Sequence, residues 1–192
     1  MKMTRSGMVA MMLVLAGCAT IDVHSDFDTR ADFSGLKTFA WVPDMKQASQ
    51  DPRINNTLTD SRIRSAVENA LIAKGYQKSD AGQPDFWVAY QAAIEKKLDA
   101  TVVRAPYATP STRDIANGHF TQDLTWAYGG SQTFLNQYEE GTLILDIVDP
   151  KKQKLMWRGT AKATLEGGRS SAKKEARLNA GVQKIFATFP PK

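Results

Sequence analysis

The spacing of apolar residues predicts two amphipathic helices. In each, apolar side chains recur three or four positions apart and form a single stripe: Ile63, Val67, Ala70 and Leu71 in the first, and Leu178, Val182, Ile185 and Phe189 in the second. The first helix is expected over residues 58–74, with Thr57 or Thr59 as its N-cap. Gly75 follows at the position where a left-handed residue commonly ends a helix.

Alternating apolar and polar residues predict strands in much of the remaining chain. Three segments are expected strands on this ground: residues 85–97, 133–148 and 155–165. The last two are expected to form a hairpin around a turn at residues 149–152. Residues 36–42 are expected to form another strand, because they are rich in aromatic and β-branched residues and are followed by Pro43. Residues 21–27 are either a further short strand or a tether. Residues 98–131 lose the alternation, and we expect a long loop there, which in a compact domain is usually functional or mobile.

The order of these elements predicts the fold class. It is strand, strand, helix, strand, long loop, strand, strand, helix. A helix with one apolar stripe needs a sheet face to cover. We therefore expect an α+β fold, in which a mainly antiparallel sheet of about five strands carries both helices on one face. The length of 192 residues favours one domain, which is expected over residues 36–192.

The first 17 residues have the pattern of a signal peptide. Lys2 and Arg5 precede an unbroken apolar run from Met8 to Ala16. This run is too short for a transmembrane helix, which needs about 20 apolar residues. We expect residues 1–17 to be removed, so that residues 18–35 carry the N-terminal tether or first strand of the mature protein.

The segment Leu15-Ala16-Gly17-Cys18 resembles the lipobox of bacterial lipoproteins. The resemblance implies that diacylglycerol is attached to the Cys18 thiol, that the chain is cleaved before Cys18, and that the new α-amine is acylated. Several acyl chains attach a protein firmly, whereas one chain binds only marginally. Ala19 rather than aspartate follows the cysteine, which by analogy with Gram-negative sorting indicates the outer membrane. We therefore expect a protein anchored there by lipid and facing the periplasm.

Further segments resemble one family. They are Asp32–Trp41 (DFSGLKTFAW), Gly141–Asp149 (GTLILDIVD), Leu155–Ala161 (LMWRGTA) and the closing Phe189–Pro191. Together they resemble a family of bacterial lipoproteins known only as a domain of unknown function. The resemblance covers nearly the whole mature chain. It implies a fold and a lipobox, but no activity and no catalytic residue.

Two places have the S-x-x-K spacing of penicillin-binding proteins, in which a lysine accepts the proton of a serine one helical turn away. The first is Ser34 with Lys37, which enters an expected strand and has no S-D-N or K-T-G partner. The second lies at the expected start of the last helix: Ser170 and Ser171 with Lys173 and Lys174. We therefore favour a tight turn for the first place, and Ser170 or Ser171 as a helix cap for the second.

The two histidines are poorly placed for catalysis. His24 is close to the expected anchor and His119 lies in the expected loop, whereas a triad needs a rigid base. Acidic residues alternate around the first histidine, so an extended chain points four potential cation ligands one way: Asp22, His24, Asp26 and Asp28. A solvated acidic tether is the favoured interpretation, and we expect neither a metal ion nor a cofactor.

Charge narrows the choice of partners. The net charge of +5 falls to +3 when Lys2 and Arg5 leave with the signal peptide, and this excess is too scattered for nucleic acid. Lysines cluster at expected strand ends and helix starts: Lys96, Lys97, Lys151, Lys152, Lys154, Lys173 and Lys174. They fit either anionic headgroups and cell-wall polymers or, as we favour, solvated turns. The expected loop holds four scattered aromatic residues, which either form a binding lip or fold back: Tyr107, Phe120, Trp126 and Tyr128.

These observations favour a membrane-anchored, non-catalytic binding or structural module of the cell envelope. Its partner would be a protein, lipid or glycan. The alternative is a periplasmic serine hydrolase or transferase that acts on the cell wall or on lipid, suggested by the compartment and the S-x-x-K spacing.

Overall fold

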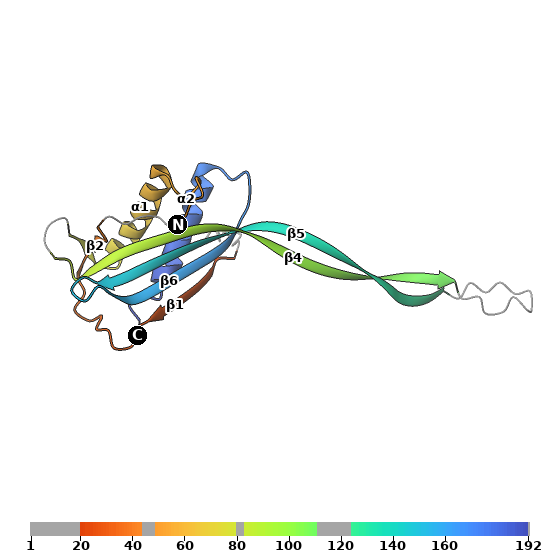
Figure 1. The fold of residues 1–192 in the computed structure, drawn as a ribbon, viewed down its shortest axis with the longest axis horizontal. Helices are drawn as coiled ribbons and strands as arrows, with labels where there is room; N and C mark the ends of the chain where they lie inside the picture. The colour runs from red at the N-terminus through yellow and green to blue at the C-terminus, as the bar shows by residue number, and fades with distance from the viewer. Residues whose placement is uncertain (1–19, 44–48, 80–82, 111–123, 192) are drawn as a thin grey trace, which may run out of the picture.

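The computed structural model describes residues 20–43, 49–79, 83–110 and 124–191, which form a six-stranded sheet and two helices (Figure 1). Along the chain the elements are β1 (Asp22–Phe27), β2 (Thr38–Trp41), α1 (Thr57–Ala73), β3 (Gln77–Lys78), β4 (Phe86–Pro110), β5 (Leu124–Asp149), β6 (Lys154–Leu165) and α2 (Ser171–Phe186). The α+β class and both helices are therefore confirmed, and residues 21–27 supply a strand. Within these ranges no helix has the length and apolar character needed to cross a bilayer.

The sheet differs in two details from the expected one of about five strands. Its order is β1-β6-β5-β4-β2-β3, in which β1, β6, β5 and β4 pair antiparallel while β2 runs parallel to β4 and β3. The parallel pair of β2 and β3 is connected through α1, because parallel neighbours need a crossover connection, which is usually a helix. The chain then passes from β3 to the other side of β2, where β4 also pairs parallel to β2. The sixth strand, β3, has two residues and is too short to show an alternation.

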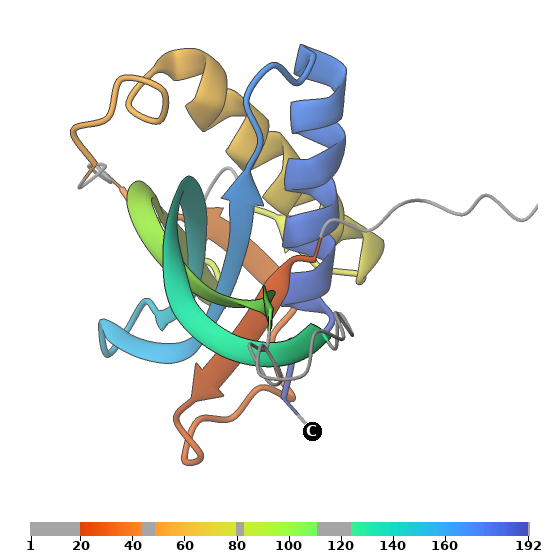
Figure 2. The same ribbon diagram turned by 90° about the vertical axis from the view of Figure 1, so that its right-hand side faces the viewer.

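Both helices lie side by side on one face of the sheet (Figure 2). The predicted stripes supply buried residues of both helices, each at most 3% exposed: Ile63, Val67 and Leu71 in α1, and Val182 and Ile185 in α2. The expectation that the second helix reaches Phe189 was wrong, because α2 ends at Phe186 and Phe189 is buried in the segment that follows it. They pack on the inward side chains of the sheet: Phe39, Phe86, Val88, Tyr90, Leu145, Ile147 and Trp157. This face holds the buried core of the described chain.

One glycine sets how closely α2 approaches the sheet. A Cβ atom on Gly159 of β6 would collide with Cγ2 of Ile185 and with the ring of Trp157. That ring stacks on Phe186, with 5.9 Å between centroids and 14° between planes. Glycine is therefore required here because the helix and the indole fill the space that a side chain would need.

The helix ends agree in part with the sequence. The N-cap of α1 is Asn56, whose side chain accepts a hydrogen bond from the backbone N–H of Thr59 at 2.8 Å, so the expectation of Thr57 or Thr59 was wrong. The expected caps at the other ends are confirmed: Ser170 caps α2, and Gly75 has a φ of 94° just beyond α1. The helix begins at Thr57, one residue earlier than expected, so its N-cap position falls on Asn56.

The prediction of a long loop over residues 98–131 was wrong for residues 98–110 and 124–131, while residues 111–123 lie outside the described residues. β4 and β5 continue as a two-stranded antiparallel ribbon to the pair Pro110 and Leu124, and this ribbon projects well beyond the rest of the molecule (Figure 1). We call residues 98–110 and 124–137 the arm. The register shifts between Arg104 and Pro106. Backbone hydrogen bonds hold a ribbon together without any apolar face, so residues 98–131 lacked the alternation that predicts a strand.

Candidate functional site

A pocket of about 420 Å³ lies between the sheet and the N-terminal halves of both helices, at the end from which the arm projects. We call it the junction pocket. Its apolar lining comes from every layer of the fold: Ile21, Ile54, Ile63, Ala92, Ala93, Ile94, Leu143, Ala161, Ala163, Leu165 and Leu178. Its volume falls within the range of about 300–1,000 Å³ that small-molecule sites occupy.

Small residues keep this space open. Ala92, Gly141 and Ala163 lie on three neighbouring strands beneath the pocket, and Gly181 lies above them on α2. Gly181 is buried, yet a Cβ atom built on it meets no atom within 4 Å. Interiors are normally close-packed. A buried glycine that faces open space therefore shows that the helix and the sheet diverge here, one turn from their closest approach at Gly159.

Charged side chains also line the pocket, and the six that form ion pairs are 21–61% exposed, which places them at its mouth toward solvent. Five are cationic and three are anionic: Arg53, Arg62, Arg169, Lys174 and Arg177, with Glu139, Glu166 and Glu175. Each glutamate lies near an arginine, at 2.8 Å for Glu139 and Arg53, 2.7 Å for Glu166 and Arg169, and 4.0 Å for Glu175 and Arg62. The lining therefore has a net positive charge of two.

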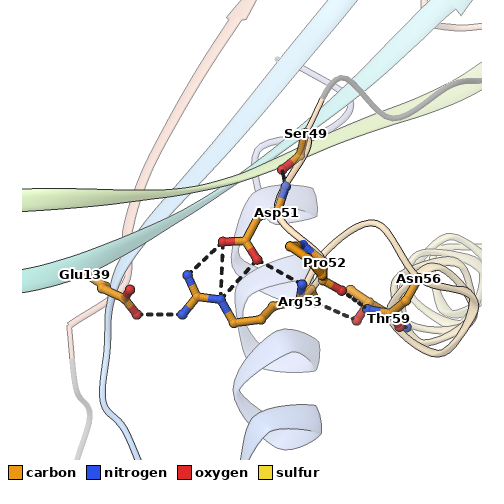
Figure 3. Close-up of polar contacts among 7 residues, drawn as sticks. All are labelled: Ser49, Asp51, Pro52, Arg53, Asn56, Thr59 and Glu139. Carbon is orange, nitrogen blue, oxygen red and sulfur yellow. Dashed lines mark hydrogen bonds and ion pairs between the residues drawn. The ribbon is translucent and has the colours of Figure 1, made fainter.

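Arg53 links the segment before α1 to the base of the arm (Figure 3). Its guanidinium donates to both carboxylate oxygens of Asp51, at 2.7 Å for the shortest bond, and to Oε2 of Glu139 on β5 at 2.8 Å. These bonds hold the pKa of Asp51 and the pKa of Glu139 below their usual ranges, and they raise the pKa of Arg53. All three groups are thus charged at neutral pH, and the pairing fixes one wall of the pocket.

The segment that carries Arg53 is itself held by α1 (Figure 3). The Thr59 hydroxyl donates to the carbonyl oxygen of Arg53 at 2.9 Å, and the Asn56 amide donates to that of Pro52 at 2.9 Å. The backbone N–H of Asp51 donates to the Ser49 hydroxyl at 3.2 Å. Arg53 is therefore placed by the same residues that begin the helix.

None of the candidate serines, Ser34, Ser170 and Ser171, lines this pocket. The Ser34 hydroxyl donates to Oδ1 of Asp32 at 2.7 Å, while the backbone N–H of Lys37 donates to Asp85. Ser170 caps α2, and Ser171 is the first residue of that helix. The two S-x-x-K places therefore form a turn and a helix start, as we favoured. Lys174 alone of these residues lines the pocket.

The possible cation ligands lie on or beside β1. Asp22, His24 and Asp26 are exposed at alternate positions, and Asp28 follows the strand, where Arg30 donates to its carboxylate at 3.2 Å. In the described ranges no three His, Cys, Asp or Glu side chains come together as a metal-binding group. The structure therefore brings no cation site together from this alternation.

The other expected features are distributed along the molecule. Lys96 and Lys97 lie just before the arm, and the Lys151–Lys154 cluster lies at the β5–β6 turn. Three of the aromatic residues lie on the arm strands: Tyr107, Trp126 and Tyr128. The remaining candidates lie outside the described residues: Cys18, His119 and Phe120. Sequence reasoning did not find the junction pocket, although Gly181 in the middle of a helical stripe was a signal for it.

Comparison with known proteins gives a family but no activity. A family model described as Domain of unknown function (DUF4136) matches residues 23–191. No curated protein matches the sequence. A PDZ domain protein from Parabacteroides distasonis has 16% identity and a TM-score of 0.47, over 90% of this chain and 36% of that one. The PelC dodecamer from Paraburkholderia phytofirmans has 9% identity and a TM-score of 0.43, over 88% of this chain and 96% of that one. The chain thus spans about a third of the PDZ domain protein.

Proposed function

We propose a function from the geometry of the chain itself, since the chain belongs to the DUF4136 family, a domain of unknown function. It is a lipoprotein anchored through Cys18 in the outer membrane, facing the periplasm, and it acts there as a non-catalytic binding module. The junction pocket is its ligand site.

The apolar character of the junction pocket carries this proposal. Aliphatic and small side chains from the sheet and both helices form its interior, while the charged groups lie at its mouth. Among the described residues that line it there is no serine, cysteine or histidine. The pocket thus offers apolar surface to a ligand rather than a nucleophile paired with a base.

Binding of a neutral apolar probe tests the ligand site. The chain from residue 19 onward retains every strand, both helices and every core side chain, and is purified without lipid. N-phenyl-1-naphthylamine is expected to bind with increased fluorescence. Gly181→Leu places an isobutyl group in the pocket and should weaken binding, whereas Gly181→Ala, its matched control, should retain it. Ala163→Leu on the opposite wall gives a second filling variant, and thermal unfolding shows that each variant is folded. Undiminished binding by both folded filling variants would contradict the proposal.

The anchor is tested separately. Intact mass measurement of the exported protein is expected to show cleavage before Cys18 and a lipidated Cys18. A Cys18→Ser variant should leave the outer-membrane fraction. An unmodified thiol, or a variant that fractionates as before, would overturn the anchor but leave the pocket untouched.

Its non-catalytic nature is tested with a serine-directed probe. A fluorophosphonate is expected to leave the purified chain unlabelled. An adduct at Ser34, Ser170 or Ser171 would instead establish the hydrolase or transferase. Cross-linking in intact cells then identifies any envelope protein, lipid or glycan that the module binds.

A further inference from the structure

The junction pocket combines an apolar interior with a positive mouth. Its anionic side chains each lie near an arginine, and the excess of two positive charges remains on the lining. Lys174 and Arg62 lie at this mouth, on the first turn of α2 and the second turn of α1. A ligand with one anionic group and one long apolar part matches both regions, because a charge-assisted hydrogen bond holds the first and burial holds the second.

The position of the pocket brings such a ligand within reach. Ile21 lines the pocket, and Cys18 lies three residues before it. An extended chain covers about 3.3–3.6 Å per residue, so the lipid-bearing residue lies at most about 10 Å from Ile21. In the proposed lipoprotein the mouth of the pocket is therefore held close to the membrane surface, where amphiphiles with acyl chains are concentrated.

We infer that the junction pocket binds a free long-chain fatty acid. The acyl chain lies along Ile63, Leu143 and Leu178, and the carboxylate lies at the mouth beside Arg62 and Lys174. This inference rests on the proposed function, since it supplies the ligand of the same pocket. The charge of the mouth favours a free fatty acid over the acyl groups of Cys18, because diacylglycerol on a thiol and an acylated amine carry no negative charge.

Displacement of the bound fluorescent probe measures the preference for an anionic headgroup. The chain from residue 19 onward, loaded with N-phenyl-1-naphthylamine, is titrated with palmitate and with hexadecanol, which has the same chain length and no charge. Palmitate is expected to displace the probe at about tenfold lower concentration, the size of one charge-assisted bond. Equal displacement by the two would overturn the inference.

Charge-removing variants locate the carboxylate. Arg62→Gln combined with Lys174→Gln should weaken palmitate binding about tenfold and leave hexadecanol unchanged. The matched control is Lys173→Gln combined with Lys184→Gln, which removes two charges from α2 at positions that do not line the pocket, and should change neither ligand. If both double variants weakened palmitate binding equally, the effect would be general electrostatic attraction to the protein, and the inference would be overturned.

The outcomes separate this inference from the proposed function. If the probe binds and palmitate does not displace it, the inference that the ligand is a fatty acid is wrong, while the pocket remains a ligand site. If the probe itself does not bind, both fail. Photo-cross-linking of the lipidated protein in membranes with a diazirine palmitate should label the peptide that holds Leu178. No labelling of the lipidated protein, together with palmitate binding by the lipid-free chain, would instead show that the acyl groups of Cys18 fill the pocket.

Discussion

Gly159 allows α2 to pack closely on the sheet because glycine has no Cβ atom. In Gly159→Ala the added methyl group collides with Ile185 and Trp157, both fully buried. Forcing extra volume into a packed interface costs about 1–3 kcal/mol, and we expect a loss near the upper end because neither neighbour has free space. Urea unfolding monitored by tryptophan fluorescence measures the change.

Gly181 offers a matched comparison on the same helix. Gly181→Ala adds the same methyl group where no atom lies within 4 Å, and alanine favours a helix over glycine by about 1 kcal/mol. We therefore expect Gly181→Ala to increase the free energy of unfolding. If the two glycine variants lowered stability equally, packing at Gly159 would not be the cause.

Asp85 joins the start of β2 to the start of β4 and should make stability depend on pH. Its carboxylate accepts hydrogen bonds from the backbone N–H groups of Thr38 and Lys37 and from the Thr38 hydroxyl, at 2.8–3.0 Å. These bonds lower the pKa of Asp85, with the Thr38 backbone bond the largest cause. The folded state therefore gains stability from this group above its ordinary pKa of about 3.9, and loses it as the pH falls through the lowered value.

The comparison of Asp85→Asn with the natural chain isolates this effect. At pH 7 the variant is expected to be less stable by about 1 kcal/mol, because a neutral acceptor forms weaker hydrogen bonds. As the pH is lowered toward 2 the aspartate becomes protonated as well, and the difference should shrink. Chemical denaturation at both pH values measures it, and a difference that stayed constant would show that the charge of Asp85 plays no part.

The start of α1 shows how far individual residues were predictable. Asn56, Thr57 and Thr59 all favour an N-cap, so composition alone did not choose among them. The choice comes from tertiary contacts, because the segment before the helix is held to β5 through Arg53 and Glu139. Gly75 was predictable because a left-handed residue after a helix is a local requirement.

At the scale of elements, the arm should be dispensable for folding. Among residues 91–102 and 133–144, where the structure describes the side chains, no residue belongs to the buried core. The larger apolar side chains of the arm in these ranges are exposed: Leu98 71%, Leu135 71%, Val102 57% and Phe134 54%. Replacing residues 99–136 by a two-residue Asn-Gly turn should change the free energy of unfolding by less than about 1 kcal/mol, since an isolated ribbon adds little stability. Differential scanning calorimetry measures it.

The same replacement tests whether the body depends on the arm. Retention of Glu139 preserves the Arg53 contact and the wall of the junction pocket, so binding of the neutral probe should persist. A loss of several kcal/mol would show that the arm supports the fold, contrary to this expectation.

The helices and the body strands were predictable because each buries one face, and burial imposes a period on the sequence. The described side chains of the arm, at residues 98–102 and 133–137, are all exposed, so they impose no such period, and Pro106 and Pro110 favoured a loop. β3 escaped detection for a different reason, since two residues cannot define a period. Hydrophobic periodicity therefore predicts the elements that pack on the core, and it misses strands that are held only by backbone hydrogen bonds.

At the scale of the whole molecule, the pocket was not predictable because no segment contains it. It arises where α2 diverges from β6, and its lining comes from residues far apart in the chain that share only small or aliphatic side chains. The expected anchor, by contrast, is a contiguous motif that the sequence states directly at Cys18. Its lipidation stays a prediction for the measurements described above.

The short tether predicts how the anchored protein is oriented. Glu166 follows β6 at the end that holds the pocket, and Lys152 precedes β6 at the other end, roughly 35 Å away at about 3.3 Å per residue. A fluorophore on Glu166→Cys should be quenched by nitroxide headgroup lipids more strongly than one on Lys152→Cys in the lipidated protein. Equal quenching would show that the body has no preferred orientation.

The arm extends the reach of the protein beyond its compact body. From Leu98 to Pro110, at about 3.3 Å per residue, it spans roughly 40 Å. In the proposed lipoprotein the far end of the arm would therefore reach a region that the body does not enter. A partner bound at the far end of the arm would therefore lie at a fixed distance from the lipid-bearing residue of the proposed lipoprotein.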